Sequence, residues 1–162
     1  MKEITALVSR NRKLFFKDKG MLFSSMITPV ILIVLYATFL ANVYKDSFVS
    51  ATKDMIVAAQ LAAALLAVSC VTVTFCVNLT MVQDRASGAR KDFDVSPVSK
   101  TKIYIGYFLS TVLNSLMVNG TALALCLLYI LKMGWYMSAS DVIFVILDMI
   151  LLVLFGSTLS SI

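Results

Sequence analysis

The stretch QDRASGARKDFDVSPVSKTK, residues 83–102, decides how the chain must fold, because it separates two long apolar runs. It carries five basic residues and three aspartates, whereas the flanking runs, 55–82 and 103–131, contain no charged residue. Both runs exceed the roughly 20 residues that a helix needs to cross a bilayer. We therefore expect two long membrane helices joined by a charged loop, so that a partner holding the loop would act on both helices.

The composition places the whole chain in the membrane class. Of its 162 residues, 60% are apolar and 14% are charged, whereas a soluble domain is about half apolar and about a quarter charged. The basic residues flank the apolar runs, where such residues commonly set topology and contact anionic lipid. Membrane lipid is therefore an expected partner, and nucleic acid is not.

Two further apolar runs complete the predicted fold, an all-α polytopic bundle of transmembrane helices. The four spans are 22–41, 55–82, 103–131 and 141–162. The second and third are long enough to require tilting or projection from the membrane. Pro29 within the first span predicts either a hinge or a static kink, because proline removes one backbone hydrogen bond.

Residues 1–21 are predicted to form an amphipathic helix at the membrane surface. Apolar residues recur at spacings of three, four and seven, and basic residues occupy the other side, a pattern typical of interfacial helices. Asn11 and Asp18 interrupt the apolar stripe. The alternative is a positively charged flank that only anchors the first span.

The distribution of basic residues predicts the topology. Residues 1–21 hold six Lys or Arg and residues 83–102 hold five, whereas the connections 42–54 and 132–140 hold two and one. Loops rich in Lys and Arg stay in the cytosol. We therefore expect a multi-pass protein of the cell membrane whose N-terminus and 83–102 loop are cytosolic.

Five polar residues inside the spans are candidates for buried or functional positions, since polar side chains at membrane depth usually face protein or water. They are Gln60, Asn78, Asn114, Asn119 and Asp148. The carboxyl group of Asp148 is either a functional group or a shallow one that reaches water. Ala59, Ala63 and Ala67 recur every four residues, which favours close helix packing.

No catalytic constellation is present in the sequence, so we do not expect an enzyme. The chain has no histidine, its three cysteines lie inside apolar runs without metal-ligand spacing, and no phosphate-binding loop occurs. We therefore expect neither a metal nor a cofactor in this chain. The sequence ends at residue 162 without a polar flank, so we expect the natural protein to continue.

The order of these features resembles the ABC-2 type permease subunits of ABC exporters. The match covers nearly the whole chain: a basic first helix, an early proline, a long second span and a charged loop before a long third span. Asp84 stands where the family commonly has glutamate, and Ala89-Arg90-Lys91 departs from the usual pattern. The residues that carry the resemblance are Pro29, Asp84-Arg85, Gly88, Val95 to Ser99, Tyr104 and Gly106.

The resemblance implies a permease that supplies the first four of six helices, with residues 1–21 as a connecting helix. A separate ATPase subunit would bind ATP and drive a coupling helix within residues 84–94, and two permeases, as identical or related copies, would pair with two ATPases. The implied coupling residues are Asp84, Arg85, Gly88, Arg90, Lys91, Ser96 and Pro97.

Two other functions stay open from the residues alone. A four-span scaffold or assembly protein would have the same composition and no ATPase partner. A secondary transporter would use Asp148 as a proton site, although no basic residue lies within the spans to partner it. Neither the transported substrate nor the pairing of the permeases follows from the sequence.

Overall fold

The computed structural model describes residues 2–40, 42–43, 53–89, 91, 95, 98–133 and 138–161. Within these residues the regular structure is entirely helical, which confirms the predicted all-α bundle. The helices are α1 (Lys2–Lys17), α2 (Lys19–Leu35), the π-helix η1 (Tyr36–Leu40), α4 (Lys53–Ala86), α6 (Lys100–Met133) and α7 (Ala139–Ser160).

Three of these helices contain stretches that are long and apolar enough to cross a membrane: Ala59–Ala86, Lys100–Leu131 and Ala139–Ser160. A fourth crossing is reached if α1 and α2, which meet at an angle of 77°, are counted together as one broken span. The predicted first span corresponds to α2 and η1. α2 continues through the buried Pro29, so the choice between a hinge and a static kink stays open.

Asp18 forms the bend between α1 and α2, because its side chain starts the second helix. Its Oδ1 accepts hydrogen bonds from the backbone N–H groups of Gly20, at 2.9 Å, and Met21, at 3.2 Å. Those N–H groups have no partner inside the helix, and aspartate is a favoured residue at this position. The predicted surface helix therefore ends at Lys17, and Lys19 to Met21 already belong to α2.

The charged loop is shorter than its polar composition suggests. α4 continues to Ala86 and α6 begins at Lys100, so both ends of the predicted 83–102 loop are helical. α4 and α6 each have 34 residues and are therefore about 50 Å long. Residues 83–86 of α4 and 100–102 of α6 therefore extend past the uncharged runs 55–82 and 103–131 toward the connection.

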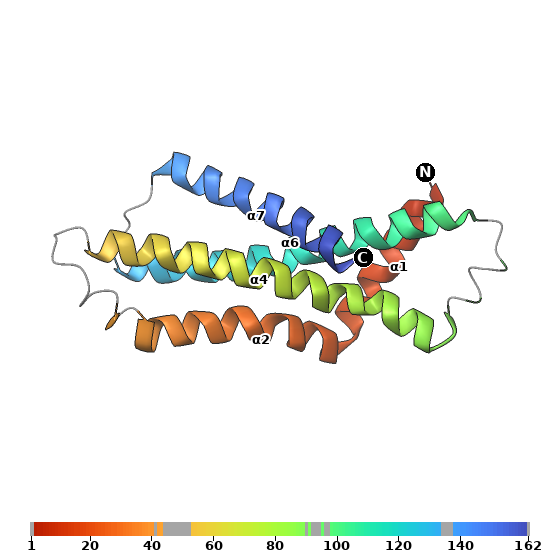
Figure 1. Ribbon diagram of the computed structural model, residues 1–162, viewed down its shortest axis with the longest axis horizontal. Coiled ribbons are helices and arrows are strands. Elements are labelled where there is room, and N and C mark those ends of the chain that lie inside the picture. The colour runs from red at the N-terminus through yellow and green to blue at the C-terminus, as the bar shows by residue number, and fades with distance from the viewer. Residues whose placement is uncertain are drawn as a thin grey trace.

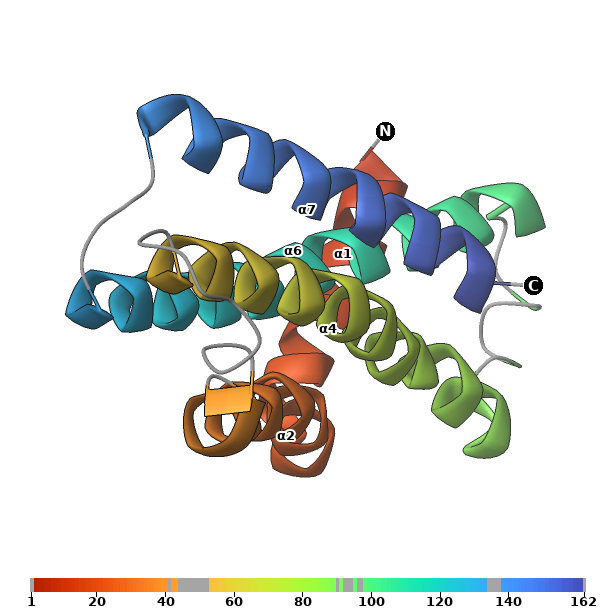
Figure 2. The ribbon, with the colours of Figure 1, turned by 60° about the vertical axis from the view of Figure 1, so that its left-hand side comes forward.

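α4 lies at the centre of the bundle, with α2, α6 and α7 around it and α1 crossing one end (Figures 1 and 2). We call that end, where α4 ends and α6 begins, the loop end. At the other end, Tyr36 packs with residues of α4 and α6 in a buried apolar cluster. A second cluster joins α4 and α6 to α7. At the loop end, α1 meets the end of α4 and the start of α6.

Candidate functional site: the junction of α1, α4 and α6

α1 packs on protein through one narrow seam. Leu7, Asn11 and Phe15 recur every four residues, so they share a helix face, and all three are buried. Leu7 packs with Ile103 and Tyr107 of α6, and Phe15 packs with Val73 and Val77 of α4. Asn11, which interrupts the apolar stripe in the sequence, is only 1% exposed. This seam of α1 thus meets α4 and α6, whereas Leu14 and Phe16 of the same helix are exposed. The predicted position of α1 at the membrane surface stays a prediction.

Gly106 allows this close approach. A Cβ atom placed on Gly106 would lie 3.1 Å from the Cβ of Leu7, which is tighter than about nine in ten real Cβ contacts. A larger residue would push α1 away from α6. The glycine that contributes to the family resemblance therefore has a packing role in this structure.

Asp84 in the last turn of α4 joins three helices. One oxygen, Oδ2, lies 2.9 Å from Nη1 of Arg10, and Oδ1 lies 3.2 Å from Nη2. Oδ2 also accepts a hydrogen bond from the hydroxyl group of Tyr107 on α6, at 2.5 Å. Asp84 is only 7% exposed, and the hydrogen bonds to it raise the pKa of Arg10, although desolvation acts in the opposite direction. We call this group of three side chains the junction.

A second ion pair ties the start of α1 to the start of α6. Nζ of Lys102 lies 2.9 Å from Oε2 of Glu3, and both side chains are about half exposed. The hydrogen bond from Lys102 lowers the pKa of Glu3. Exposed pairs of this kind contribute little to stability, so this pair is expected to add little to the packing of α1 on α6.

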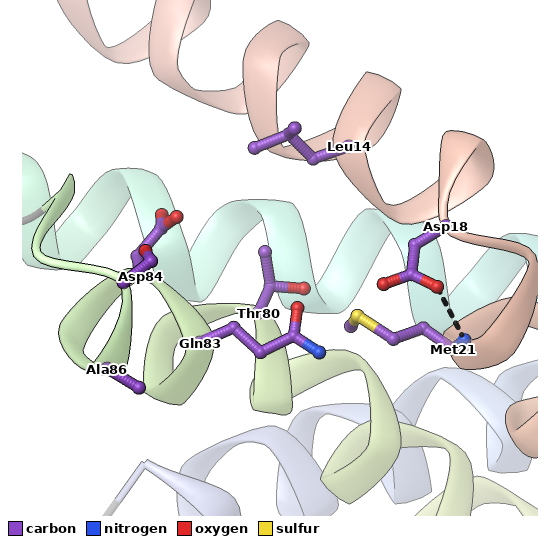
Figure 3. A pocket seen from close by; sticks show the side chains of 8 residues that line it. Leu14, Asp18, Met21, Thr80, Gln83, Asp84 and Ala86 are labelled. Atoms are coloured by element: carbon purple, nitrogen blue, oxygen red, sulfur yellow. Dashed lines mark hydrogen bonds between the residues drawn. The ribbon is translucent and has the colours of Figure 1, made fainter.

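A cavity of about 410 Å³ lies between the α1–α2 bend and the last turns of α4. Figure 3 shows Asp18 and Met21 on one side of it and Thr80 and Gln83 on the other. Asp84 lines the same cavity from the end of α4. The cavity therefore lies beside the apolar cluster in which Phe15 and Met21, on either side of the bend, pack with Val73 and Val77 of α4.

The predicted coupling residues fall into three groups. Asp84 is buried and bound to Arg10 and Tyr107, so its carboxylate points into the bundle. Arg85 and Lys91 are exposed, and Gly88 has a φ of 79°, a conformation that favours glycine. The other predicted residues, Arg90, Ser96 and Pro97, lie outside the described part of the chain.

The polar residues of the spans occupy different environments. Gln60 and Asp148 are exposed, and Nδ2 of Asn78 donates to the carbonyl oxygen of Ser160 on α7. Asn114 and Asn119 are buried in α6, where their Nδ2 atoms bond to Oγ of Ser110 and to the carbonyl of Ser115. Within the described residues, Oδ1 of both asparagines has no hydrogen-bond partner. These five residues therefore do not form one site.

Arg10 and Tyr107 are the junction residues that the sequence does not single out. Arg10 is one of several basic residues in α1, and Tyr107 lies in an apolar run, so neither stands out until the helices are assembled. Two residues of the family resemblance, Tyr104 and Gly106, lie near the start of α6. Of these, Gly106 lies against Leu7 of α1.

Comparison with known proteins identifies the family of this bundle. The family model of the ABC-2 type transporter matches residues 2–162. No curated protein and no solved structure matches the chain. The match extends over α1, the charged loop and all the apolar helices, and the structure has the helices that a multi-pass membrane protein requires. The chain therefore belongs to the ABC-2 type transporter family and is a membrane permease component of an ABC transporter.

Proposed function

We propose that this chain is the permease of an ABC exporter and is driven from the cytosol by a separate ATPase subunit. The observation that carries this proposal is the junction, where the last turn of α4 is bound to both α1 and α6 next to the loop. A force applied to the loop would reach three helices at once. ATP would bind to the partner subunit, and this chain would catalyse no reaction.

The exposed charged residues after the junction provide the contact in this proposal. Arg85 and Lys91 are exposed beside the turn at Gly88, and Arg90, Ser96 and Pro97 complete the predicted contact. Asp84 would position α4 through its bonds to Arg10 and Tyr107 instead of touching the ATPase. In this proposal the exposed loop residues bind the ATPase, and Asp84, Arg10 and Tyr107 transmit its movement to the helices.

The orientation and assembly follow from the same proposal. The loop end carries most of the basic residues, so it would face the cytosol of a cell-membrane protein. Two permeases, identical or related, would pair with two ATPases. Closure of the ATPases would favour one arrangement of the helices over another, since a partner shifts an equilibrium only by binding two states with different affinity.

Charge reversal at the loop tests the proposed contact. Arg85→Glu together with Lys91→Glu is expected to reduce at least tenfold the amount of nucleotide-binding subunit that co-purifies in mild detergent. Lys132→Glu is the control, because it reverses one basic residue of α6 at the opposite end of the bundle. Equal recovery of the subunit with the unmodified protein, the double variant and Lys132→Glu would contradict the proposal.

A second experiment separates binding from transmission. Tyr107→Phe removes the hydroxyl group that binds Asp84 but leaves the exposed loop residues intact. It is expected to leave ATPase recovery unchanged and to reduce the stimulation of ATP hydrolysis by the assembled permease. If recovery and stimulation fall together, the junction would belong to the binding surface itself.

A further inference from the structure

Two buried asparagines in the seam between α1 and α6 each have a polar atom without a partner. Asn11 of α1 and Asn114 of α6 are both 1% exposed. Within the described residues, neither Nδ2 of Asn11 nor Oδ1 of Asn114 has a hydrogen-bond partner. Leaving a buried donor or acceptor unpaired is costly, so one donor and one acceptor in this seam need an explanation.

The contacts along the seam place the two asparagines close to the same level. The ion pair at the start of α1 joins residues 99 positions apart, and Leu7 lies against Gly106, with the same separation, one turn later. α1 and α6 therefore run in the same direction where they touch, which brings Asn11 to the level of Ser110. Asn114 lies one turn further along the same face of α6.

Apolar side chains close the seam on both sides of the asparagines. Leu7 packs with Tyr107 on one side, and Phe15 shares a buried cluster with Val118 on the other. Asn114 follows Tyr107 by seven residues and precedes Val118 by four, so it lies between them on one face of α6. The aliphatic and phenyl groups cannot bond to an amide, and the hydroxyl group of Tyr107 already binds the carboxylate of the junction. The two asparagines must therefore be satisfied from within the seam.

The polar neighbours of the two asparagines leave one end of each amide unused. Oδ1 of Asn11 accepts a hydrogen bond from Nη1 of Arg10 at 3.0 Å, so Nδ2 is the unused end. On α6, Nδ2 of Asn114 lies 3.5 Å from Oγ of Ser110, which is longer than most N–H···O bonds. The hydroxyl group of Ser110 can donate its own hydrogen as well. The seam thus holds an amide donor, an amide acceptor and a hydroxyl group within about one helical turn.

Water matches this set of groups better than an ion does. An ion would suit only one of the two amides, whereas a water molecule can accept from Asn11 and donate to Asn114. Polar groups too far apart to bond directly are commonly bridged by water, and a buried water makes about three hydrogen bonds to otherwise unpaired groups. Ser110 is small, so α1 needs to part only slightly from α6 to admit one molecule.

We propose that one buried water molecule binds between Asn11 and Asn114, accepting from Nδ2 of the first and donating to Oδ1 of the second, with Ser110 as its third partner. Because Asn11 also bonds to Arg10, the water extends the polar network of the junction. The network then runs from the end of α4 through α1 to a point on α6 about 10 Å beyond Tyr107. The site lies inside this chain, so it does not depend on contact with an ATPase.

Thermal unfolding of the full-length protein in detergent tests whether the two asparagines share a partner. Asn11→Leu and Asn114→Leu are each expected to lower the melting temperature, and the double variant is expected to lose no more than the worse single variant, because all three remove the same bridge. Asn119→Leu is the matched control, since Asn119 is equally buried in α6 but lies about 140° around the helix from Asn114. Its loss should add to that of Asn11→Leu.

Two results of this experiment would overturn the proposal. A rise in melting temperature in either single variant would mean that the amide stands unpaired in a dry seam. Losses that add in the double variant would mean that the two side chains have no common partner.

Radiolytic footprinting, resolved to single residues by mass spectrometry, distinguishes a bound water from a direct bond between the amides. Hydroxyl radicals formed from the water would oxidise Phe15, which is 0% exposed and lies one turn from Asn11. Tyr36, a buried aromatic residue in the cluster at the opposite end, is the control. In the unmodified protein Phe15 is expected to be oxidised at least fivefold faster than Tyr36, and in the double variant at a similar rate.

Equal rates at Phe15 and Tyr36 in the unmodified protein would overturn the water bridge, whatever the melting temperatures show. This measurement needs no variant, so it decides the question even if the substitutions prevent folding. Arg85→Glu with Lys91→Glu is expected to change neither measurement. Failure of the water site is thereby distinguished from failure of the proposed contact with an ATPase.

Discussion

Arg10 and Asp84, which are 74 positions apart in the chain, form a two-point ion pair at the loop end of the bundle. This geometry is favoured by the planar guanidinium group, because two parallel N–H groups meet two carboxylate oxygens. The pair joins the first helix to Asp84, the first residue of the predicted coupling element 84–94. The position of α1 and the end of α4 are therefore fixed together.

Removing one partner of this pair is expected to destabilise the protein. Asp84→Asn leaves the guanidinium of Arg10 without its counter-ion, and such losses cost about 3 kcal/mol at buried sites. Arg10 is partly exposed, which makes that figure an upper value here. Thermal unfolding in detergent measures the effect. The double variant Arg10→Met with Asp84→Leu is expected to lose less than the sum of its two single variants, and additive losses would show that the charges do not interact.

Gly106 is predicted to be intolerant of a side chain. Gly106→Val would push α1 away from α6, because even a Cβ atom lies 3.1 Å from Leu7, and overpacking of this kind costs about 1–3 kcal/mol. Gly120→Ala is the matched control in the same helix, where an added Cβ meets nothing within 4 Å. It is expected to stabilise α6 by up to about 1 kcal/mol, since alanine is the better helix former. Equal melting temperatures for the two variants would contradict the proposed crossing.

The contact between Gly156 and Thr74 is open to a rescue experiment. Gly156→Ala places a methyl group 2.5 Å from Oγ1 of Thr74 and is expected to cost about 1–3 kcal/mol. Thr74→Ala removes the clashing oxygen, so the double variant should recover most of the loss. A double variant that is no more stable than Gly156→Ala would locate the clash in the backbone of α4 instead. Thermal unfolding of the four proteins provides the comparison.

Asn78 is expected to contribute modestly to the packing of α4 on α7. Asn78→Leu removes the hydrogen bond to the carbonyl of Ser160, and such bonds between membrane helices average about 0.6 kcal/mol. The predicted decrease in stability is therefore smaller than that for Gly156→Ala. A larger decrease, measured in the same detergent, would indicate that Asn78 has a further partner.

Acidification is predicted to weaken the pair between Glu3 and Lys102. The pKa of Glu3 is lowered by Lys102, so the stabilisation is complete above the ordinary glutamate pKa of about 4.3. It is lost as the pH falls through the lower pKa of the folded protein. The melting temperatures of the native protein and of Glu3→Gln should therefore differ slightly at pH 7 and converge in acid. A difference that persists at low pH would mean that Glu3 acts through something other than its charge.

The resemblance to ABC-2 permeases rests on the order of features along the chain, and the family match over residues 2–162 confirms it. Apolar length, proline and glycine positions and clustered charge are properties of the sequence itself, so no knowledge of helix packing is needed to recognise them. The roles of the individual loop residues stay predictions, because those roles depend on the surface of a second protein. Asp84 illustrates the difference. Its place in the charged loop suggests a contact with a partner protein, whereas in the structure its carboxylate is buried and bound to Arg10 and Tyr107.

The amino-acid order alone dictates a bundle of membrane helices and the places where charge gathers. Apolar length is decisive because lipid offers backbone groups no hydrogen bonds, so each span must be a helix. Which side chains meet is settled by tertiary packing, because a helix sequence does not specify its neighbour. Packing brings Arg10 to Asp84 and Tyr107, buries Asn11 within an apolar seam and leaves Asp148 on an open flank. Those outcomes depend on how the helices cross. The crossings are set by close contacts between residues far apart in the chain, such as Gly106 with Leu7 and Gly156 with Thr74.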